Sequence, residues 1–320
     1  MKAGGYCMQL DIAKQDSPLV IAVQNNNGIL VPIQGLDEFL YRDRDLRILC
    51  LLHGRELFDI LYDDHGLIHY ADNKLALSKI IEIDTNRTVM SIIGKVGESV
   101  LVRRCTQYAN LNLLWMRIAS GRQVQRGTAL KYRAVGTGFK STEREYPKAY
   151  NPNDTQRDII WLDEEGYRYQ MNGSTGTAGI DAGLQVKVSM NGMRYVYKDV
   201  LDAVYEVPLV YFDLNNDYGL VYRKVQQELR SRGEVSRNLQ DWFISGRDVD
   251  PDAYDEIEYY TDMVRALVNG RLRIDDLINR AERFPSFGSA VMAGALETIY
   301  SEIYLEASDD WDNTTPRITT

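Results

Sequence analysis

The sequence predicts an α+β fold, in which a β-hairpin-rich body of sandwich or barrel type precedes a small helical C-terminal region. Short apolar runs separated by turn-forming residues fill the first two-thirds of the chain. In the last third, the spacing of apolar residues changes to a helical period. The 320 residues are 44% hydrophobic, and a chain of about 300 residues buries roughly 75% of its unfolded surface. We therefore expect a hydrophobic core that needs no disulfide or metal to stabilise it.

Two hairpins are predicted from Asn-Gly pairs, which tolerate the positive φ angles of tight turns. The first is Leu19–Ile33, where two apolar runs flank Asn27-Gly28. The second is Leu184–Val200, where apolar residues alternate on both sides of Asn191-Gly192. Strand-like composition predicts further strands in short β-branched segments, which are Lys74–Asp84, Thr88–Val96 and Ser99–Cys105.

Two more segments share one hairpin pattern, with an acidic turn that ends in glycine. They are Ile60–Tyr70 and Ile160–Gln170. Asp, Asn and Gly at these positions are typical of β-turns. We expect a hairpin in both places.

The helical region follows from apolar stripes and capping signals. In Val249–Gly270, Asp250 is the expected N-cap, a proline follows it, and glycine ends the segment. The other expected helices are Leu220–Gly233, Arg237–Ile244, Ile274–Phe284 and Ser289–Ala307. This divides the chain into a β-rich body at 1–215, a helical region at 216–307 and a flexible tail at 308–320.

Charge and cysteine content narrow the class of protein. The net charge is −9, which argues against a dedicated binder of nucleic acid or anionic membranes, because phosphates require a basic surface. The three cysteines show no paired spacing, which favours a reducing compartment. No secretion signal or membrane-length apolar stretch is found. We expect synthesis in a cytoplasm, no membrane association and no cofactor.

The histidines are the first candidate for chemistry, because all three lie within residues 53–69. His65 and His69 have the i, i+4 spacing of a helical zinc site, and Asp63 and Asp64 are adjacent. A metal-dependent hydrolase that uses these four residues is one alternative. The turn that separates His65 from His69 argues against it, as does Ile160–Gln170, which shares the pattern without the histidines. Calcium loops, phosphate loops and nucleophile motifs each lack a residue that their chemistry requires.

The second candidate is a basic segment at 117–148. It holds eight lysines and arginines against two glutamates in an acidic protein. Two interpretations of this segment compete. It is either an extended arm that docks on the acidic surface of a neighbouring subunit, or a nucleic-acid-binding segment with interleaved aromatic residues. We favour docking. The acidic partner surface is the start of the helix near residue 250. The predicted partner-binding residues are Arg117, Arg122, Arg126, Lys131, Tyr132, Arg133, Lys140 and Arg144 on the basic side and Asp248, Asp250, Asp252, Asp255 and Glu256 on the acidic side.

The hairpins, the basic arm, the polar loops and the 21 tyrosines against seven phenylalanines together resemble the structural proteins of tailed-phage particles, such as tail, neck or baseplate components. No single motif carries this resemblance. It implies a non-enzymatic assembly protein, located in the virion, whose partners are copies of itself or other virion proteins. A nucleic-acid-associated accessory factor that uses segment 117–148 is a further alternative.

Overall fold

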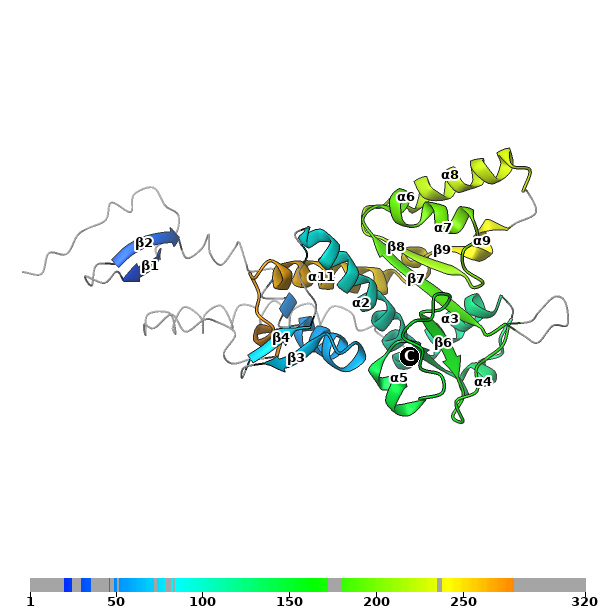
Figure 1. The fold of residues 1–320 in the computed structure, drawn as a ribbon, viewed down its shortest axis with the longest axis horizontal. Helices are drawn as coiled ribbons and strands as arrows, with labels where there is room; N and C mark the ends of the chain where they lie inside the picture. The colour runs from blue at the N-terminus through cyan, green and yellow to red at the C-terminus, as the bar shows by residue number, and fades with distance from the viewer. Residues whose placement is uncertain are drawn as a thin grey trace, which may run out of the picture. The chain divides into compact units, whose positions relative to one another are not determined.

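The computed structural model describes residues 20–24 and 30–35 by their backbone, and residues 46–278 except 47–48, 51, 72–73, 79–81, 83, 122, 172–179 and 235–237. The described residues belong to one compact unit that ends at Ile278. Figure 1 shows its helices and strands. The predicted helix Ser289–Ala307 and the tail at 308–320 lie outside the described residues.

Two hairpins occur among the described residues up to Leu77. The first lies where it was predicted, and the second has other boundaries than predicted. β1 (Val20–Gln24) pairs antiparallel with β2 (Leu30–Gly35), which confirms the first hairpin. β3 (Ile68–Ala71) pairs antiparallel with β4 (Lys74–Leu77).

The hairpin predicted at Ile60–Tyr70 is wrong in its first half. Residues Ile60–Asp64 form η1, a π-helical turn that continues the preceding helix. Gly66 then turns the chain with a φ of +59° before β3 begins. Packing overrides the strand-like composition of this segment, because the helical turn lets both Ile60 and Leu61 be buried.

The strands predicted at Thr88–Val96 and Ser99–Cys105 are also wrong, because both segments belong to one helix. α2 spans Thr85–Gln107 and is capped by the Asp84 side chain, which accepts from the Asn86 N–H. Its β-branched residues suggested strands, but the apolar positions also fit a helical period. The buried residues Val89, Ile92, Ile93, Val96 and Val100 lie at the spacing that places them on one face.

The basic segment 117–148 is folded into the body and is not an extended arm. It comprises the end of α3 (Ala109–Ser120), α4 (Arg126–Ala129), β5 (Arg133–Gly136) and α5 (Lys140–Glu145). Its apolar residues provide the reason, because side chains such as Val124, Ala134 and Phe139 are fully buried. Their burial stabilises the segment despite its charge.

A five-stranded mixed sheet forms the centre of the unit, in the order β5-β6-β7-β8-β9. The first three strands, β5, β6 (Ile159–Leu162) and β7 (Gly183–Ser189), are antiparallel. β8 (Leu209–Asp213) and β9 (Phe243–Ser245) then add in parallel to β7. The mixture of helices and sheet confirms the coarse α+β prediction. The described strands form neither a sandwich nor a barrel, and the sheet continues across the boundary predicted at residue 215.

The hairpin predicted at Leu184–Val200 is correct for β7 and wrong after it. Asn191 caps a helical turn, α6 (Gly192–Tyr195), by accepting from the Arg194 N–H, and α7 (Tyr197–Leu201) follows. Gly192 packs so closely that an added Cβ would lie 2.9 Å from the Tyr211 hydroxyl. The Asn-Gly pair therefore serves as a helix cap and a close contact, not as a hairpin turn. By contrast, the hairpin at Ile160–Gln170 is confirmed, with Leu162 bridged to Arg168.

Of the helices predicted after residue 216, Leu220–Gly233 and Val249–Gly270 are confirmed, and Ile274–Phe284 is confirmed as far as the structure describes it. The helix predicted at Arg237–Ile244 is wrong in its last part, because only Leu239–Trp242 is helical and Phe243–Ser245 forms strand β9 of the central sheet. α8 (Tyr218–Ser231), α9 (Leu239–Trp242), α10 (Gly246–Val249), α11 (Pro251–Val268) and α12 (Asp275–Ile278) occur in this order. Asp250 caps α11 by accepting from the Ala253 N–H, as predicted.

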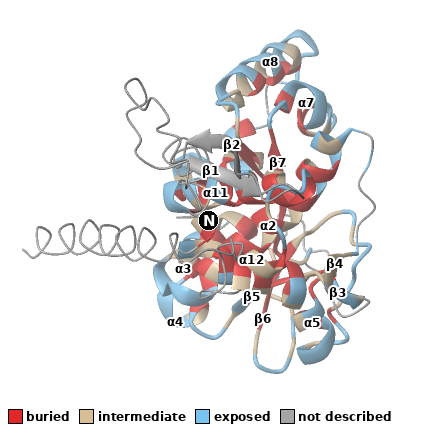
Figure 2. Ribbon diagram, turned by 90° about the vertical axis from the view of Figure 1, so that its left-hand side faces the viewer, coloured by how far each residue is buried: buried red, intermediate tan, exposed pale blue. Residues whose placement is uncertain are grey.

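Helices cover both faces of the sheet. The side chains of β8 show this, because successive residues of the strand point into two different hydrophobic cores. Val210 and Phe212 point into the large core beneath α2 and α11. Leu209 and Tyr211 point into a second core beneath α7 and α8. Figure 2 shows buried residues concentrated along the sheet and the helix faces that cover it. The fold is thus a three-layer arrangement of helix, sheet and helix.

Candidate functional site

The histidines and aspartates that were weighed as an alternative metal site do not converge. His65 Nε2 lies 2.8 Å from the Lys95 carbonyl oxygen and 3.0 Å from Ser99 Oγ, and the ring packs against Phe139. His69 lies at the surface beside Ser78. Burial lowers the pKa of His65 to about 3, so the ring is neutral and joins η1 to α2.

The two aspartates of that cluster are also engaged or separate. Asp64 accepts two hydrogen bonds from Arg103, at 3.0 and 3.1 Å. Burial raises the pKa of Asp64, against the nearby Arg103 charge. Among the described residues, no group of three or more His, Cys, Asp or Glu is arranged to hold a metal ion. The interpretation of Asp63, Asp64, His65 and His69 as one metal site is therefore not supported by their positions.

The predicted basic residues are spread over several elements, and part of them are paired within the chain. Arg117 donates to the Val124 carbonyl, and Tyr132 packs edge-on against Tyr169. Arg133 pairs with Glu145 and Lys140 with Glu143. Arg126, Lys131 and Arg144 are exposed. Arg122 lies outside the described residues.

The predicted acidic surface has an internal partner that the sequence did not indicate. Arg104 of α2 binds Asp250 through two hydrogen bonds of 2.8 and 2.9 Å, and it also binds Asp252 and Glu256. Asp248 and Asp255 are exposed. Arg104 of α2 thus offsets part of the negative charge at the start of α11, which leaves less acidic charge for a neighbouring subunit.

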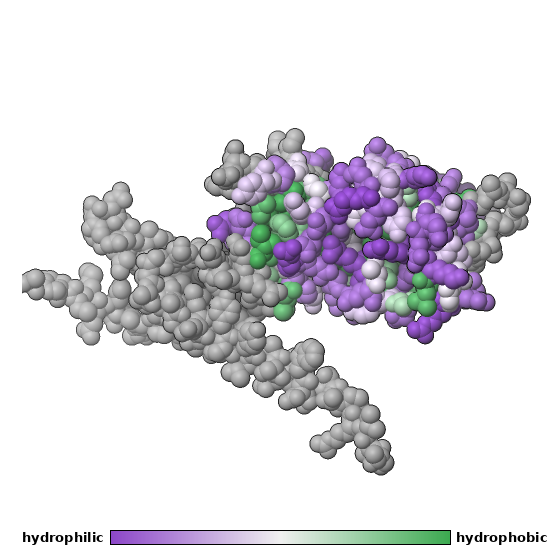
Figure 3. All heavy atoms as spheres, turned by 90° about the horizontal axis from the view of Figure 1, so that it is seen from below, coloured by the Kyte–Doolittle hydropathy of each residue, from purple (hydrophilic) through white to green (hydrophobic). Residues whose placement is uncertain are grey.

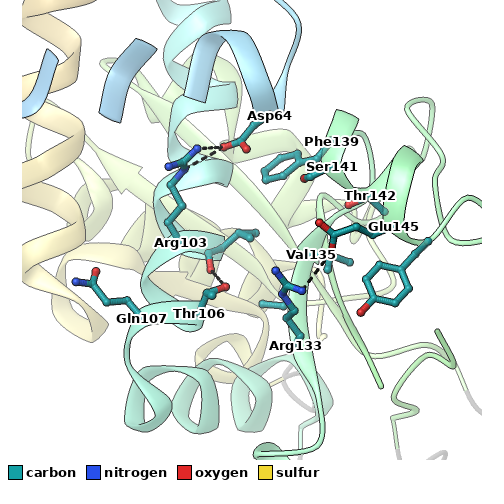
Figure 4. A pocket seen from close by; sticks show the side chains of 13 residues that line it. Asp64, Arg103, Thr106, Gln107, Arg133, Val135, Phe139, Ser141, Thr142 and Glu145 are labelled. Carbon is teal, nitrogen blue, oxygen red and sulfur yellow. Dashed lines mark hydrogen bonds and ion pairs between the residues drawn. The ribbon is translucent and has the colours of Figure 1, made fainter. Parts of the chain in front are cut away.

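A pocket of about 300 Å³ lies between α2, β5 and α5. Figure 4 shows the Asp64–Arg103 and Arg133–Glu145 pairs on its walls. Each arginine is thus matched by a carboxylate, and the lining has no net charge from these four groups. The pocket gives no clear preference for an anionic or a cationic ligand.

A more informative group of side chains lies where β6 separates from β7. The two strands pair only at Ile159–Leu184 and Ile160–Gly183, and β7 then continues alone on that side. The Val186 N–H would remain without a ladder partner. Asp158, directly before β6, accepts this N–H at 2.7 Å.

Gln185 and Lys187 extend this group from β7. Residues two apart in a strand lie on the same face, while their neighbours Leu184, Val186 and Val188 enter the large core. The Gln185 side chain is 6% exposed, and its Nε2 donates to Asp158 Oδ2. Its Oε1 is buried and has no hydrogen-bond partner. A buried oxygen without a donor is costly and is rare in native proteins.

Glu98 of α2 is the second carboxylate of the group. The adjacent Gly97 lets α2 approach β7 closely, since an added Cβ would lie 2.5 Å from Val188 Cγ2. No hydrogen bond to Glu98 is present among the described residues, although Asp158, Lys95 and Lys187 all act on it electrostatically. Glu98 and Asp158 both keep partial solvent access.

Electrostatically, this group consists of two partly buried carboxylates on which two lysines, Lys95 and Lys187, act. Burial raises the pKa of Glu98 well above its usual range, and repulsion from Asp158 raises it further. Burial also raises the pKa of Asp158 to about 6, against the Val186 N–H and the Lys187 ammonium group. We name Glu98, Asp158, Gln185 and Lys187 the β6–β7 site.

Lys187 has a second set of partners on the α7 side. Its Nζ lies 5.4 Å from the centre of the Tyr205 ring, and the Tyr205 hydroxyl is near enough to act on the ammonium group electrostatically. The Tyr205 hydroxyl donates to Asp199 Oδ2 at 3.0 Å. Lys187 is therefore acted on electrostatically by the two carboxylates of the β6–β7 site, and it also lies beside this Tyr205–Asp199 pair.

The chemistry available to the β6–β7 site is cation binding beside an ammonium group. Two carboxylates and an amide oxygen are hard oxygen ligands, and Mg²⁺ is commonly bound by one or two carboxylates with water and substrate phosphate as further ligands. Sequence reasoning did not find this site, because its residues come from three elements up to 89 positions apart. The one local signal is the pair of polar residues, Gln185 and Lys187, in an otherwise apolar strand.

No family model matches the chain, and no similar protein was found among curated proteins or solved structures. In the part of the chain that the structure describes, no helix has both the length and the apolar character needed to cross a bilayer.

Proposed function

We propose that the protein is a divalent-cation-dependent hydrolase that cleaves phosphodiester bonds at the β6–β7 site. The observation that carries the proposal is the Gln185 Oε1 atom, which is buried without a partner while its own amide group contacts the Asp158 carboxylate. A cation bound by both groups would satisfy this oxygen. It would also neutralise the repulsion that raises the pKa of Glu98.

The residues present fit Mg²⁺ or Mn²⁺ better than zinc. The ligand atoms would be a carboxylate oxygen of Asp158 and the amide oxygen of Gln185, with the Glu98 carboxylate as a direct or water-bridged neighbour. Oxygen ligands suit Mg²⁺ and Mn²⁺, whereas zinc sites are built mainly from cysteine and histidine. With three protein ligands at most, water and a substrate oxygen would complete the octahedral shell that Mg²⁺ demands.

An ammonium group beside such a cation favours an anionic substrate whose charge grows during the reaction. In phosphodiester hydrolysis, water adds to phosphorus, the ester P–O bond breaks, and the products are a phosphomonoester and an alcohol. A bound divalent cation supplies Lewis-acid stabilisation of the phosphoryl oxygens and activates water. Lys187 supplies fixed positive charge where negative charge develops.

The net charge of −9 bears on the choice of substrate. An acidic protein binds a polyanion weakly unless positive charge is concentrated near the site. Lys95 and Lys187 provide such charge beside the two carboxylates. Affinity for a nucleic acid would therefore depend strongly on the cation and on ionic strength.

The test is hydrolysis by the purified full chain. The substrates are bis(p-nitrophenyl) phosphate and end-labelled single- and double-stranded DNA and RNA, each with Mg²⁺, Mn²⁺ or EDTA. We expect cleavage of at least one substrate with a divalent cation and none with EDTA. Glu98→Gln, Asp158→Asn and Lys187→Met should each lower the rate by about 100-fold or more.

Two control variants show whether such a loss of rate is specific to the β6–β7 site. Glu165→Gln changes an exposed carboxylate at a hairpin turn, and His69→Ala changes the surface histidine that the sequence suggested as a metal ligand. Both should retain wild-type rates. Cation-independent cleavage, or full activity in Asp158→Asn, would contradict the proposal.

The expectation of a non-enzymatic virion protein stays a prediction. The face shown in Figure 3 is mostly hydrophilic, and hydrophobic residues form small groups on it. Exposed tyrosines such as Tyr70 and Tyr167 still offer contact area for a partner. Sedimentation of the purified chain tests this prediction, because an assembly protein should form large complexes with itself or with particle proteins.

A further inference from the structure

Lys187 of the β6–β7 site is contacted from two directions, and only one of them involves carboxylates that would bind the cation. On that side, Asp158 and Glu98 interact electrostatically with the ammonium group. On the other side, the Tyr205 ring centre lies 5.4 Å from Lys187 Nζ, and Asp199 fixes the Tyr205 hydroxyl through a 3.0 Å hydrogen bond.

We propose that Tyr205, oriented by Asp199, is a positioning residue that holds the Lys187 ammonium group at the reacting phosphate once a cation occupies the two carboxylates. This inference rests on the proposed function of the β6–β7 site. It assigns a role to two residues that are not cation ligands.

The physical reason is competition for the carboxylates. Without a cation, the negative charges of Asp158 and Glu98 attract the Lys187 ammonium group. A divalent cation between them would take over most of their charge, and the four-carbon side chain of Lys187 would then be free to move. An aromatic face on the opposite side, anchored by the hydrogen bond of its hydroxyl to Asp199, would keep the ammonium group in place through a contact that the cation does not disturb.

The position of Tyr205 in the fold supports a fixed orientation. Tyr205 precedes the buried Val207 at the entrance to β8, and its ring packs against the second core. Asp199 lies on α7, directly before the buried Val200 and one turn after the buried Val196. Both side chains are therefore carried by well-packed backbone, as precise positioning requires.

The experiment is a double-mutant cycle in kinetics. Tyr205→Phe removes the hydroxyl and keeps the ring, whereas Tyr205→Leu removes both. Each is measured in the wild-type and the Lys187→Met backgrounds with Mn²⁺ and bis(p-nitrophenyl) phosphate. Tyr195→Phe, an exposed tyrosine on α6, is the matched control. The affinity for Mn²⁺ is measured separately by calorimetry.

We expect Tyr205→Phe to lower kcat about tenfold, with KM and Mn²⁺ affinity changed less than about threefold. Tyr205→Leu should lower kcat further, and neither change should have an additional effect when Lys187 is already methionine. Multiplicative losses in the double variants, or equal losses in kcat and Mn²⁺ affinity, would overturn the inference and leave the hydrolase intact. A wild-type protein that neither binds Mn²⁺ nor hydrolyses the ester would overturn the proposed function, and the role of Tyr205 with it.

Discussion

Replacing Asp158 by asparagine should stabilise the cation-free protein, because the carboxylate is held at an electrostatic cost. Burial raises the pKa of Asp158 from 3.8 to about 6. The folded state therefore binds a proton more tightly than the unfolded state, and stability falls as the pH rises from about 4 to 6. At about 1.4 kcal/mol per pKa unit, the ionised carboxylate costs the folded state about 3 kcal/mol above pH 6.

The asparagine variant removes this charge but keeps an oxygen that can accept the Val186 N–H. Weakening that charge-assisted hydrogen bond offsets about 1–2 kcal/mol. We expect Asp158→Asn to be more stable than the wild type by about 1–2 kcal/mol in urea unfolding at pH 7.5 with EDTA. Adding Mg²⁺ should stabilise only the wild type. A variant less stable than the wild type in EDTA would refute the reasoning that this carboxylate is strained.

Three further predictions concern the scaffold around the site. Because burial lowers the pKa of His65 from 6.5 to about 3, the stability of the folded state should be full above pH 6.5 and fall by about 2 kcal/mol on going to pH 5. His65→Gln should flatten this part of the pH profile of urea unfolding. An unchanged slope would contradict the burial of a neutral His65 ring. Arg104→Met should lower the free energy of unfolding by about 3–5 kcal/mol, because it leaves the Asp250 carboxylate buried without its partner. A loss below about 1 kcal/mol in the same assay would contradict this role of Arg104. Gly97→Ala should destabilise the protein by about 1–3 kcal/mol and weaken cation binding, because the added Cβ would meet Val188. Gly94→Ala is the matched control, because nothing lies within 4 Å of its added Cβ, and it should be neutral or stabilising by up to about 1 kcal/mol. Equal effects of the two alanines would argue against the close contact of α2 with β7.

Sequence reasoning succeeded where local chemistry determines the structure. The N-cap at Asp250, the proline after it and Gly270 with its positive φ defined α11 closely. The first hairpin, the hairpin at Ile160–Gln170 and helix α8 were also found from turn residues and apolar spacing.

Sequence reasoning failed where tertiary packing decides between two local options. The apolar, β-branched run in α2 fits a strand or a helix, and the choice depends on the large core that this helix completes. Asn191-Gly192 similarly fits a hairpin turn or a helix cap. Its outcome is fixed by the close approach of Gly192 to Tyr211.

The β6–β7 site was beyond sequence reasoning for a different reason. Asp158 and Gln185 become neighbours only because β6 and β7 pair over two residues and then separate. Glu98 joins them only because Gly97 lets the helix approach the strand. The more conspicuous histidines, which the sequence already argued against as a metal site, serve another purpose, because His65 is a neutral bridge between η1 and α2.

The proposed function depends on a cation that is bound by Asp158 and the Gln185 amide oxygen. The most direct measurement is the anomalous scattering of Mn²⁺ in crystals of the full chain soaked in manganese chloride. We predict one strong peak about 2.0–2.5 Å from Asp158 and Gln185 Oε1, with Glu98 as a direct or water-bridged neighbour, and no peak at this position in Asp158→Asn crystals. An empty β6–β7 site in wild-type crystals, or a peak only at the acidic start of α11, would contradict the proposed function.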